Sequence, residues 1–239
     1  LRLNTILHFI ENAQPEVLES FLTQSRHFHE SKTIISVTRR LLSWNGWLGS
    51  IEALNSDLGS KCLDALVHVN PDIVCDTITR VFGSLSVDEL KLVKDGRRYI
   101  VSALEKLVFR KQSFHAASRL LLKLAAAENE TWGNNETNQF KQLFQLYLSG
   151  SEAEPDERFV VLDEGILSGD DRIILVCIEA LENTLRRGHF SRGGGAENIG
   201  VQPPLKDWVP KVWGEVFDFH RSGLRRLDMI RSKYQKFSS

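Results

Sequence analysis

The chain has 239 residues, of which 26% are charged, and its formal net charge is -1. That length suffices for one large helical domain or for two smaller ones. The balanced charge excludes a global field that would attract nucleic acid or an anionic membrane, so any such contact has to be local. Three cysteines without a CxxC pair are typical of reduced thiols. Because no apolar run approaches the ~20 residues of a membrane span, we expect a cytoplasmic protein without membrane contact.

Helical periodicity runs through the first part of the chain. Apolar side chains at every third or fourth position predict a helix over residues 3–12 and a second helix that begins at Pro15. A third helix is predicted over residues 31–44. A strand near residues 33–37 is its alternative, because β-branched residues gather there. Two further short helices are expected on either side of Gly59.

The next segment carries explicit helix signals. Pro71 should lie near a helix start, and Gly83 is placed to cap the same helix at its end. Ser86 followed by Glu89 resembles the reciprocal cap in which a hydroxyl and a carboxylate satisfy free backbone N–H groups. Apolar residues then line one face of residues 97–109, which predicts another amphipathic helix.

The stretch over residues 96–150 reads as consecutive helices with no room for a strand. In its central helix, Phe114 and Leu121 follow one face, while Leu120 lies on a neighbouring face. A helix that is apolar on two sides is typical of the inner helix of a stacked helical array. A further apolar stripe is expected to continue to Gly150.

A helix, a tight turn and a second helix follow, and this unit is HEAT-like. Pro155 opens the first helix, which closes at Gly169, and Asp170 caps the second helix. Helical periodicity is lost over residues 188–206, where glycines and prolines indicate a long loop. Residues 207–239 return to helix, and the basic helix at the end is expected to begin near residue 224.

These patterns predict an all-α fold, namely a HEAT- or armadillo-like helical repeat array, an α-solenoid. Four segments are expected along the chain. They are N-terminal helical repeats over 1–95, central HEAT-like repeats over 96–187, the Gly/Pro-rich loop over 188–206, and C-terminal helices with a basic tail over 207–239.

No motif predicts a catalytic, cofactor-binding or metal site. Gly193, Gly194 and Gly195 lack the Lys-Ser or Lys-Thr that follows the glycines of a phosphate-binding loop. His27 and His29 are two positions apart, so a helix would point them to different faces, away from a shared metal ion. We therefore expect a protein that is not an enzyme and that requires no cofactor.

Contact with a macromolecular partner is assigned to Trp132, Asn134, Asn135 and Arg192. Trp132 lies in a dense polar cluster, where an exposed indole could anchor a partner. The alternative is structural, because asparagine side chains mimic backbone groups and cap neighbouring helix ends.

A second set of candidate residues consists of cations near the C-terminus: Arg221, Arg225, Arg226, Arg231, Lys233 and Lys236. Such a stripe could contact the phosphates of a nucleic acid. The alternative is a solvated charged face, because no base-reading motif accompanies the charge.

Several short strings resemble a known family. They are GRR at 96–98, ALEKL at 103–107, AAAENE at 125–130, NN at 134–135 and QF at 139–140. This part of the chain is similar to the helical-repeat region of large bacterial STAND-type NTPases. The resemblance implies a C-terminal sensor or scaffold with NTPase and effector domains upstream, in a class that commonly serves anti-phage defence. The chain contains no Walker motif, so no nucleotide-binding residue is carried over.

We therefore expect a non-enzymatic protein-interaction, sensor or scaffold module that is part of a larger protein and recognises a protein or another macromolecule. The alternative is a nucleic-acid-binding helical repeat that acts through the basic C-terminal helix.

Overall fold

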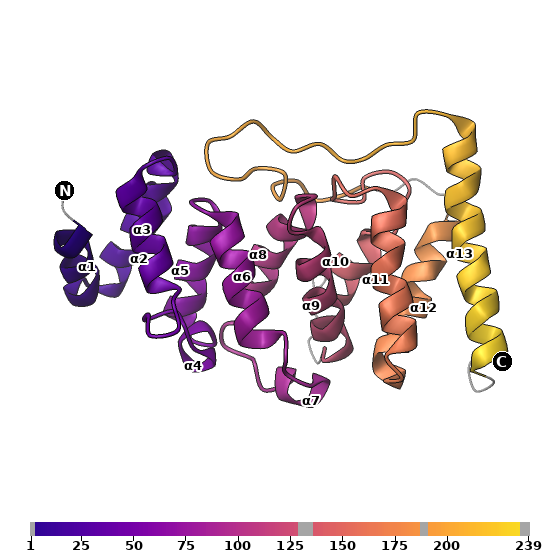
Figure 1. Cartoon of the computed structure of the whole chain (residues 1–239), viewed down its shortest axis with the longest axis horizontal. Coiled ribbons are helices and arrows are strands. Elements are labelled where there is room, and N and C mark those ends of the chain that lie inside the picture. The colour runs from indigo at the N-terminus through magenta and orange to yellow at the C-terminus, as the bar shows by residue number, and fades with distance from the viewer. Residues whose placement is uncertain (1–2, 129–135, 187–190, 235–239) are drawn as a thin grey trace. The chain divides into compact units, whose positions relative to one another are not determined.

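The computed structural model describes residues 3–128, 136–186 and 191–234. These residues contain thirteen α-helices, one short 3-10 helix and no strand (Figure 1). The all-α class predicted from the sequence is therefore confirmed. The β-branched residues near position 35 lie in helix α3, so the strand alternative is wrong. No helix in the described part of the chain has both the length and the apolar character needed to cross a bilayer.

The chain divides into two compact units. Unit 1 comprises Leu1–Leu107 and Gly195–Leu205, and unit 2 comprises Val108–Gly194 and Lys206–Ser239. Each unit therefore combines two separate stretches of sequence. The four consecutive segments expected from the sequence divide the chain differently from these two units, and they stay a prediction.

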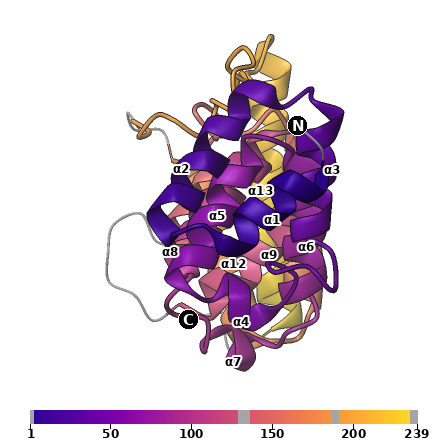
Figure 2. The ribbon, with the colours of Figure 1, turned by 90° about the vertical axis from the view of Figure 1, so that its left-hand side faces the viewer.

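Unit 1 is built from short helices, and α2 and α6 both pack on α5 (Figure 2). Reciprocal capping at Ser86 is confirmed, because Glu89 Oε2 accepts from the Ser86 N–H at 2.7 Å and Ser86 Oγ accepts from the Glu89 N–H at 3.2 Å. The elements are α1 (Leu3–Asn12), α2 (Pro15–Gln24), η1 (Ser25–Phe28), α3 (Lys32–Leu41), α4 (Ile51–Leu54), α5 (Asp57–Val67), α6 (Pro71–Phe82), α7 (Val87–Leu90) and α8 (Arg97–Phe109), of which the last two residues belong to unit 2.

Gly59 does not separate two helices, contrary to the expectation from the sequence. It lies in the first turn of α5, where its N–H donates to Ser56 Oγ at 3.0 Å. A Cβ at this position would lie 1.9 Å from the carbonyl oxygen of Ala53. The glycine is therefore required by a close approach of α4 and α5, and the helix continues through it.

Unit 2 is centred on α12, which packs against α9, α10, α11 and α13 (Figure 1). Its elements are α9 (Phe114–Ala126), α10 (Glu136–Gln142), α11 (Pro155–Leu167), α12 (Asp171–Leu185) and α13 (Trp213–Lys233). Four buried rings form a chain through its core. The centroids of Phe140, Phe144, Phe159 and Phe219 are separated successively by 5.2, 6.3 and 5.4 Å.

Two helix boundaries in unit 2 differ from the predicted ones. Helix α10 ends at Gln142 rather than near Gly150. Arg158 Nη1 donates to the carbonyl oxygens of Leu143 and Gln145, both at 3.0 Å. These two carbonyl oxygens are therefore satisfied by a side chain and not by continuation of the helix. Helix α13 begins at Trp213, so the aromatic stretch and the basic stretch form one helix instead of two elements.

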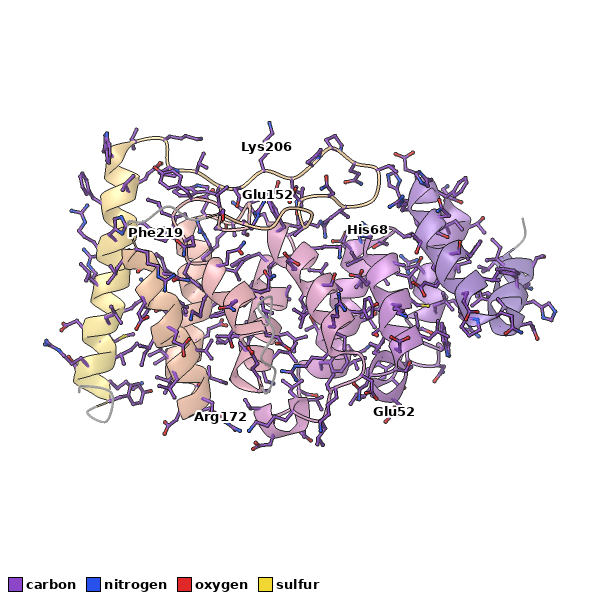
Figure 3. The ribbon with its side chains drawn as sticks, turned by 180° about the vertical axis from the view of Figure 1, so that it is seen from behind. Glu52, His68, Glu152, Arg172, Lys206 and Phe219 are labelled. Carbon is purple, nitrogen blue, oxygen red and sulfur yellow. The ribbon has the colours of Figure 1, made fainter. Side chains whose placement is uncertain are left out.

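Residues 191–206 contain no helix, and residues 207–212, which were expected to begin the C-terminal helices, contain none either. The part in unit 1 is fixed at Gly200, whose N–H donates to His68 Nδ1 at 3.0 Å (Figure 3). Gly200 has a φ of +63°, and a Cβ there would lie 2.5 Å from the carbonyl oxygen of His68. Ala196 and Ile199 are buried beside it. This part of the loop is therefore held by specific contacts.

Candidate interaction surface

Helix α13 is attached to unit 2 by one of its faces. Phe219, Gly223 and Ile230 are buried on this face, and Figure 3 shows Phe219 on the inner side of the helix. The Phe219 ring packs against the Phe159 ring of α11. Burial of these positions at intervals of four and seven residues explains why the sequence folds as a single long amphipathic helix here.

A half-buried ion pair strengthens this attachment. Arg226 Nε and Nη2 donate to the two carboxylate oxygens of Asp163 in α11, each at 2.7 Å. The same guanidinium lies 4.3 Å from the centroid of the Phe159 ring. A bidentate arginine that also stacks on an aromatic ring is geometrically specific, so Arg226 positions α13 on α11.

A second face of α13, about 120° around the helix axis from the buried one, carries large apolar side chains that are more than half exposed. Trp213 is 76% exposed, Phe217 is 55% exposed and Leu224 is 53% exposed. At 3.6 residues per turn these three positions fall within about 40° of one another around the helix axis. The Trp213 and Phe217 rings stack, with centroids 6.2 Å apart. We call Trp213, Phe217 and Leu224 the apolar row.

Cations flank the apolar row, and most of them already have partners. Arg221 pairs with Asp218 at 2.5 Å and Arg231 pairs with Asp228 at 2.7 Å. Arg225 is exposed and forms no ion pair with any residue in the described ranges. The flank of the apolar row therefore presents one uncompensated arginine.

The predicted nucleic-acid contacts are thus distributed over different environments. Arg226 is engaged with Asp163, Arg221 and Arg231 are paired within α13, and Lys233 lies 5.3 Å from the Tyr234 ring centroid. Lys236 lies outside the described residues. Contact of these cations with phosphates stays a prediction. Arg225 is the candidate that has no described partner and could therefore bind a phosphate.

Arg192 lies in an ion pair inside unit 2. Its Nη1 is 3.0 Å from Asp207 Oδ2, and its guanidinium is 4.9 Å from the centroid of the Phe109 ring. Asp207 also accepts from the Gly150 N–H at 2.6 Å, so these residues fix the backbone before α11. The other predicted partner contacts, Trp132, Asn134 and Asn135, lie outside the described residues. Arg192 therefore stabilises the backbone of unit 2, and its predicted contact with a partner stays a prediction.

The buried thiols are poor candidates for chemistry. Burial raises the pKa of Cys62 to about 12 and that of Cys177 to about 12. A thiol acts as a nucleophile only as the thiolate, so these groups are inert at neutral pH. In the described residues, no three His, Cys, Asp or Glu side chains are placed to hold a metal ion together.

The apolar row was not predicted from the sequence, in which residues 207–239 were expected only to form helices. The face that α13 buries is set by the contacts of Phe219, Gly223 and Ile230 with other elements, so periodicity alone does not show that Trp213 and Phe217 are exposed. Comparisons with known protein families, with curated proteins and with solved structures gave no match.

Proposed function

We propose that this chain is a non-enzymatic protein-interaction module and that a partner protein docks on the apolar row of α13. The observation that carries the proposal is the exposure of Trp213 and Phe217, whose rings stack on the outer face of a helix firmly attached by its inner face. Aromatic side chains held in place before binding lose little conformational entropy when a partner covers them.

The energetics favour this use of the row. An aromatic side chain buries roughly 150–250 Å² when it is covered, and tryptophan is among the residues most enriched at the centres of protein interfaces. Trp213 and Phe217 are held in neighbouring turns of α13, so one partner surface can cover both rings together. The apolar row can therefore supply most of the binding free energy of a protein partner from a few residues.

The chemistry of the partner follows from the flank of the row. Arg225 is the cation near Leu224 that has no ion pair among the described residues. A partner segment with apolar side chains and a nearby carboxylate would cover the row and also compensate this charge. We therefore propose an amphipathic protein segment, apolar on one side and acidic at its edge.

In the larger context, we propose a sensor or scaffold role in a bacterial STAND-type NTPase of the cytoplasm that takes part in antiviral defence. The support is the resemblance carried by residues 96–140 and by the helical pair α11 and α12, joined by a tight turn as in HEAT-like repeats. In this proposal the NTPase and effector domains lie upstream and respond when the apolar row is occupied.

An affinity experiment tests the docking proposal. The tagged chain would be incubated with proteins of its source cells, and a specifically retained protein would be identified and compared across variants. Trp213→Ala combined with Phe217→Ala should weaken its binding about thirtyfold or more and reduce its retention accordingly, since interface aromatics contribute ~2 kcal/mol or more. The matched control is Leu167→Ala, which removes a 63% exposed leucine from α11 and should leave retention unchanged. A retained protein that binds the double variant and the wild type equally would contradict the proposal.

Nucleic-acid binding through the same helix predicts a different pattern. Affinity would fall steeply with salt, with a slope of about -0.9 per phosphate contacted, and Arg225→Ala would reduce that slope by about one. Substitution of Trp213 and Phe217 would then have the smaller effect. Mobility-shift titrations at several salt concentrations distinguish the two, and a steep salt dependence lost in Arg225→Ala would favour the nucleic-acid function.

A further inference from the structure

A polar cavity lies within unit 2, away from the apolar row. Its volume is about 290 Å³, and it is lined by α10, the turn after α10, the C-terminal end of α12 and residues 191–193. Small-molecule sites in proteins begin at roughly 300 Å³. The cavity is therefore large enough for a ligand of only a few functional groups.

Five carboxamide side chains line the cavity: Asn138, Gln139, Gln142, Gln145 and Asn183. Two of them are more than nine-tenths buried, since Gln145 is 7% exposed and Asn183 is 6% exposed. Asn183 Nδ2 donates to the Lys141 carbonyl oxygen at 2.8 Å, whereas its Oδ1 has no hydrogen-bond partner among the described residues.

The Gln145 side chain likewise forms no hydrogen bond with the part of the chain that the structure describes. A buried polar group without a partner costs about 1–3 kcal/mol, so Asn183 Oδ1 is stabilised by a hydrogen-bond donor from outside the chain. The backbone of Gln145 is held in place, because its carbonyl oxygen accepts from Arg158 Nη1. The Asn183 amide is held by its bond to the Lys141 carbonyl oxygen, so it is positioned before any ligand enters.

The charge of the cavity is positive and small. Lys141 pairs with Glu179 at 2.8 Å, and Arg192 pairs with Asp207 at 3.0 Å, so both of these cations are compensated. Arg186 is exposed at the end of α12 and forms no ion pair with a described residue. No carboxylate is among the described lining residues. These residues thus offer one uncompensated guanidinium, which suits a single anionic group.

The described lining residues favour some ligand classes over others. None of them is aromatic, so they offer a nucleobase nothing to stack on. None of them is a carboxylate, histidine or cysteine, which disfavours metal ions and ammonium groups. Hydroxyl groups remain, because a hydroxyl both donates and accepts hydrogen bonds, as the carboxamides around it do.

We propose that this cavity binds a small polyhydroxylated anion, a sugar phosphate or a sugar acid. The anionic group pairs with Arg186, and hydroxyl groups donate to Asn183 Oδ1 and exchange hydrogen bonds with Gln145. This site is independent of partner docking on the apolar row, so failure of either proposal leaves the other standing.

Isothermal titration calorimetry on the whole chain tests the site with four probes at one ionic strength: glucose 6-phosphate, gluconate, glucose and inorganic phosphate. At least one of the two anionic sugars should bind about tenfold more tightly than both glucose and inorganic phosphate, because only it engages the guanidinium and the amides together. Comparison of glucose 6-phosphate with gluconate shows whether the cavity prefers a phosphate or a carboxylate group.

Two variants connect the binding to the cavity. Arg186→Gln should weaken the preferred anionic sugar about tenfold and leave glucose unchanged, and Gln145→Leu should weaken both sugars about fivefold. Arg119→Gln is the matched control, since it removes an exposed arginine of unit 2 that does not line the cavity. Near-ultraviolet circular dichroism would verify that Gln145→Leu is folded.

The proposal is overturned if neither anionic sugar binds more tightly than both glucose and inorganic phosphate, if both variants leave the binding intact, or if neither anionic sugar binds measurably up to about 20 mM.

Discussion

Arg158 is a fully buried cation that satisfies the backbone of another segment. Its Nη1 donates to the carbonyl oxygens of Leu143 and Gln145, and its guanidinium lies 5.5 Å from the Trp208 ring centroid. Burial lowers its pKa to about 10, so the group stays charged at neutral pH. Arg97 has the same role in unit 1, where its Nη1 donates to the carbonyl oxygens of Leu90 and Val93 at 3.0 and 3.3 Å.

Replacement of Arg158 by methionine should lower the free energy of unfolding by about 1–3 kcal/mol, because the two carbonyl oxygens would be buried without donors. Urea denaturation at neutral pH measures this change. The control is Arg119→Met, which removes an exposed arginine and should change stability by less than about 0.5 kcal/mol. Unchanged or higher stability of Arg158→Met would show that the cost of burying the guanidinium outweighs these hydrogen bonds.

His68 makes the stability of unit 1 depend on pH. Burial lowers its pKa below the ordinary value of 6.5, with a further contribution from the charge of Lys106. The Gly200 N–H donates to Nδ1, which requires that this nitrogen carry no proton. Below pH 6.5 the His68 side chain is protonated in the unfolded chain but stays neutral in the folded chain until the pH reaches its lower folded pKa. The free energy of unfolding therefore decreases as the pH falls from above 6.5 towards that folded pKa.

Urea midpoints at pH values above and below this window test the effect. The wild type should lose more stability on acidification than His68→Asn, because asparagine keeps an acceptor near the Nδ1 position and does not titrate. Parallel pH dependence of the two proteins would contradict the assignment to His68.

At the scale of single elements, α13 depends on close packing with α12. A Cβ at Gly223 would lie 2.1 Å from Thr184 Oγ1 and 3.0 Å from Thr184 Cβ, and Thr184 is fully buried. Gly214 lies on the same helix, and a Cβ there would meet no atom closer than 4.0 Å. The two glycines therefore differ in packing while sharing one helix.

Gly223→Ala should lower the free energy of unfolding by about 1–3 kcal/mol through overpacking. Gly214→Ala should leave it unchanged or raise it by up to about 1 kcal/mol, since alanine is the better helix former. Thermal and urea unfolding of both variants measure the difference. Equal effects of the two substitutions would contradict the close contact between α12 and α13.

Local signals predicted the elements well where the cause of a boundary is local. Proline at the first position of α2, α6 and α11, and the caps at Ser86 and Asp170, are such cases. The end of α10 was not predictable, because it depends on Arg158, which is 13 residues beyond Gln145. The apolar row and the cavity were missed for the same reason, since exposure and convergence of side chains depend on contacts between distant segments.

At the scale of the whole molecule, unit 2 carries the two features for which we propose binding, the apolar row on α13 and the cavity beside α10. They share no residue. Trp213→Ala combined with Phe217→Ala should therefore leave titration of the anionic sugar unchanged within about twofold, and Arg186→Gln should leave partner retention unchanged. Loss of both activities in either variant, with the fold intact, would contradict two independent sites.

The central claim is that the apolar row is a docking surface for a protein. The most direct test is a calorimetric titration of the purified partner into the wild type, into Trp213→Ala with Phe217→Ala, and into Leu167→Ala. The account predicts that the double variant raises Kd about thirtyfold or more, which corresponds to ~2 kcal/mol, while Leu167→Ala stays within about twofold of the wild type. The same Kd for all three proteins would contradict it.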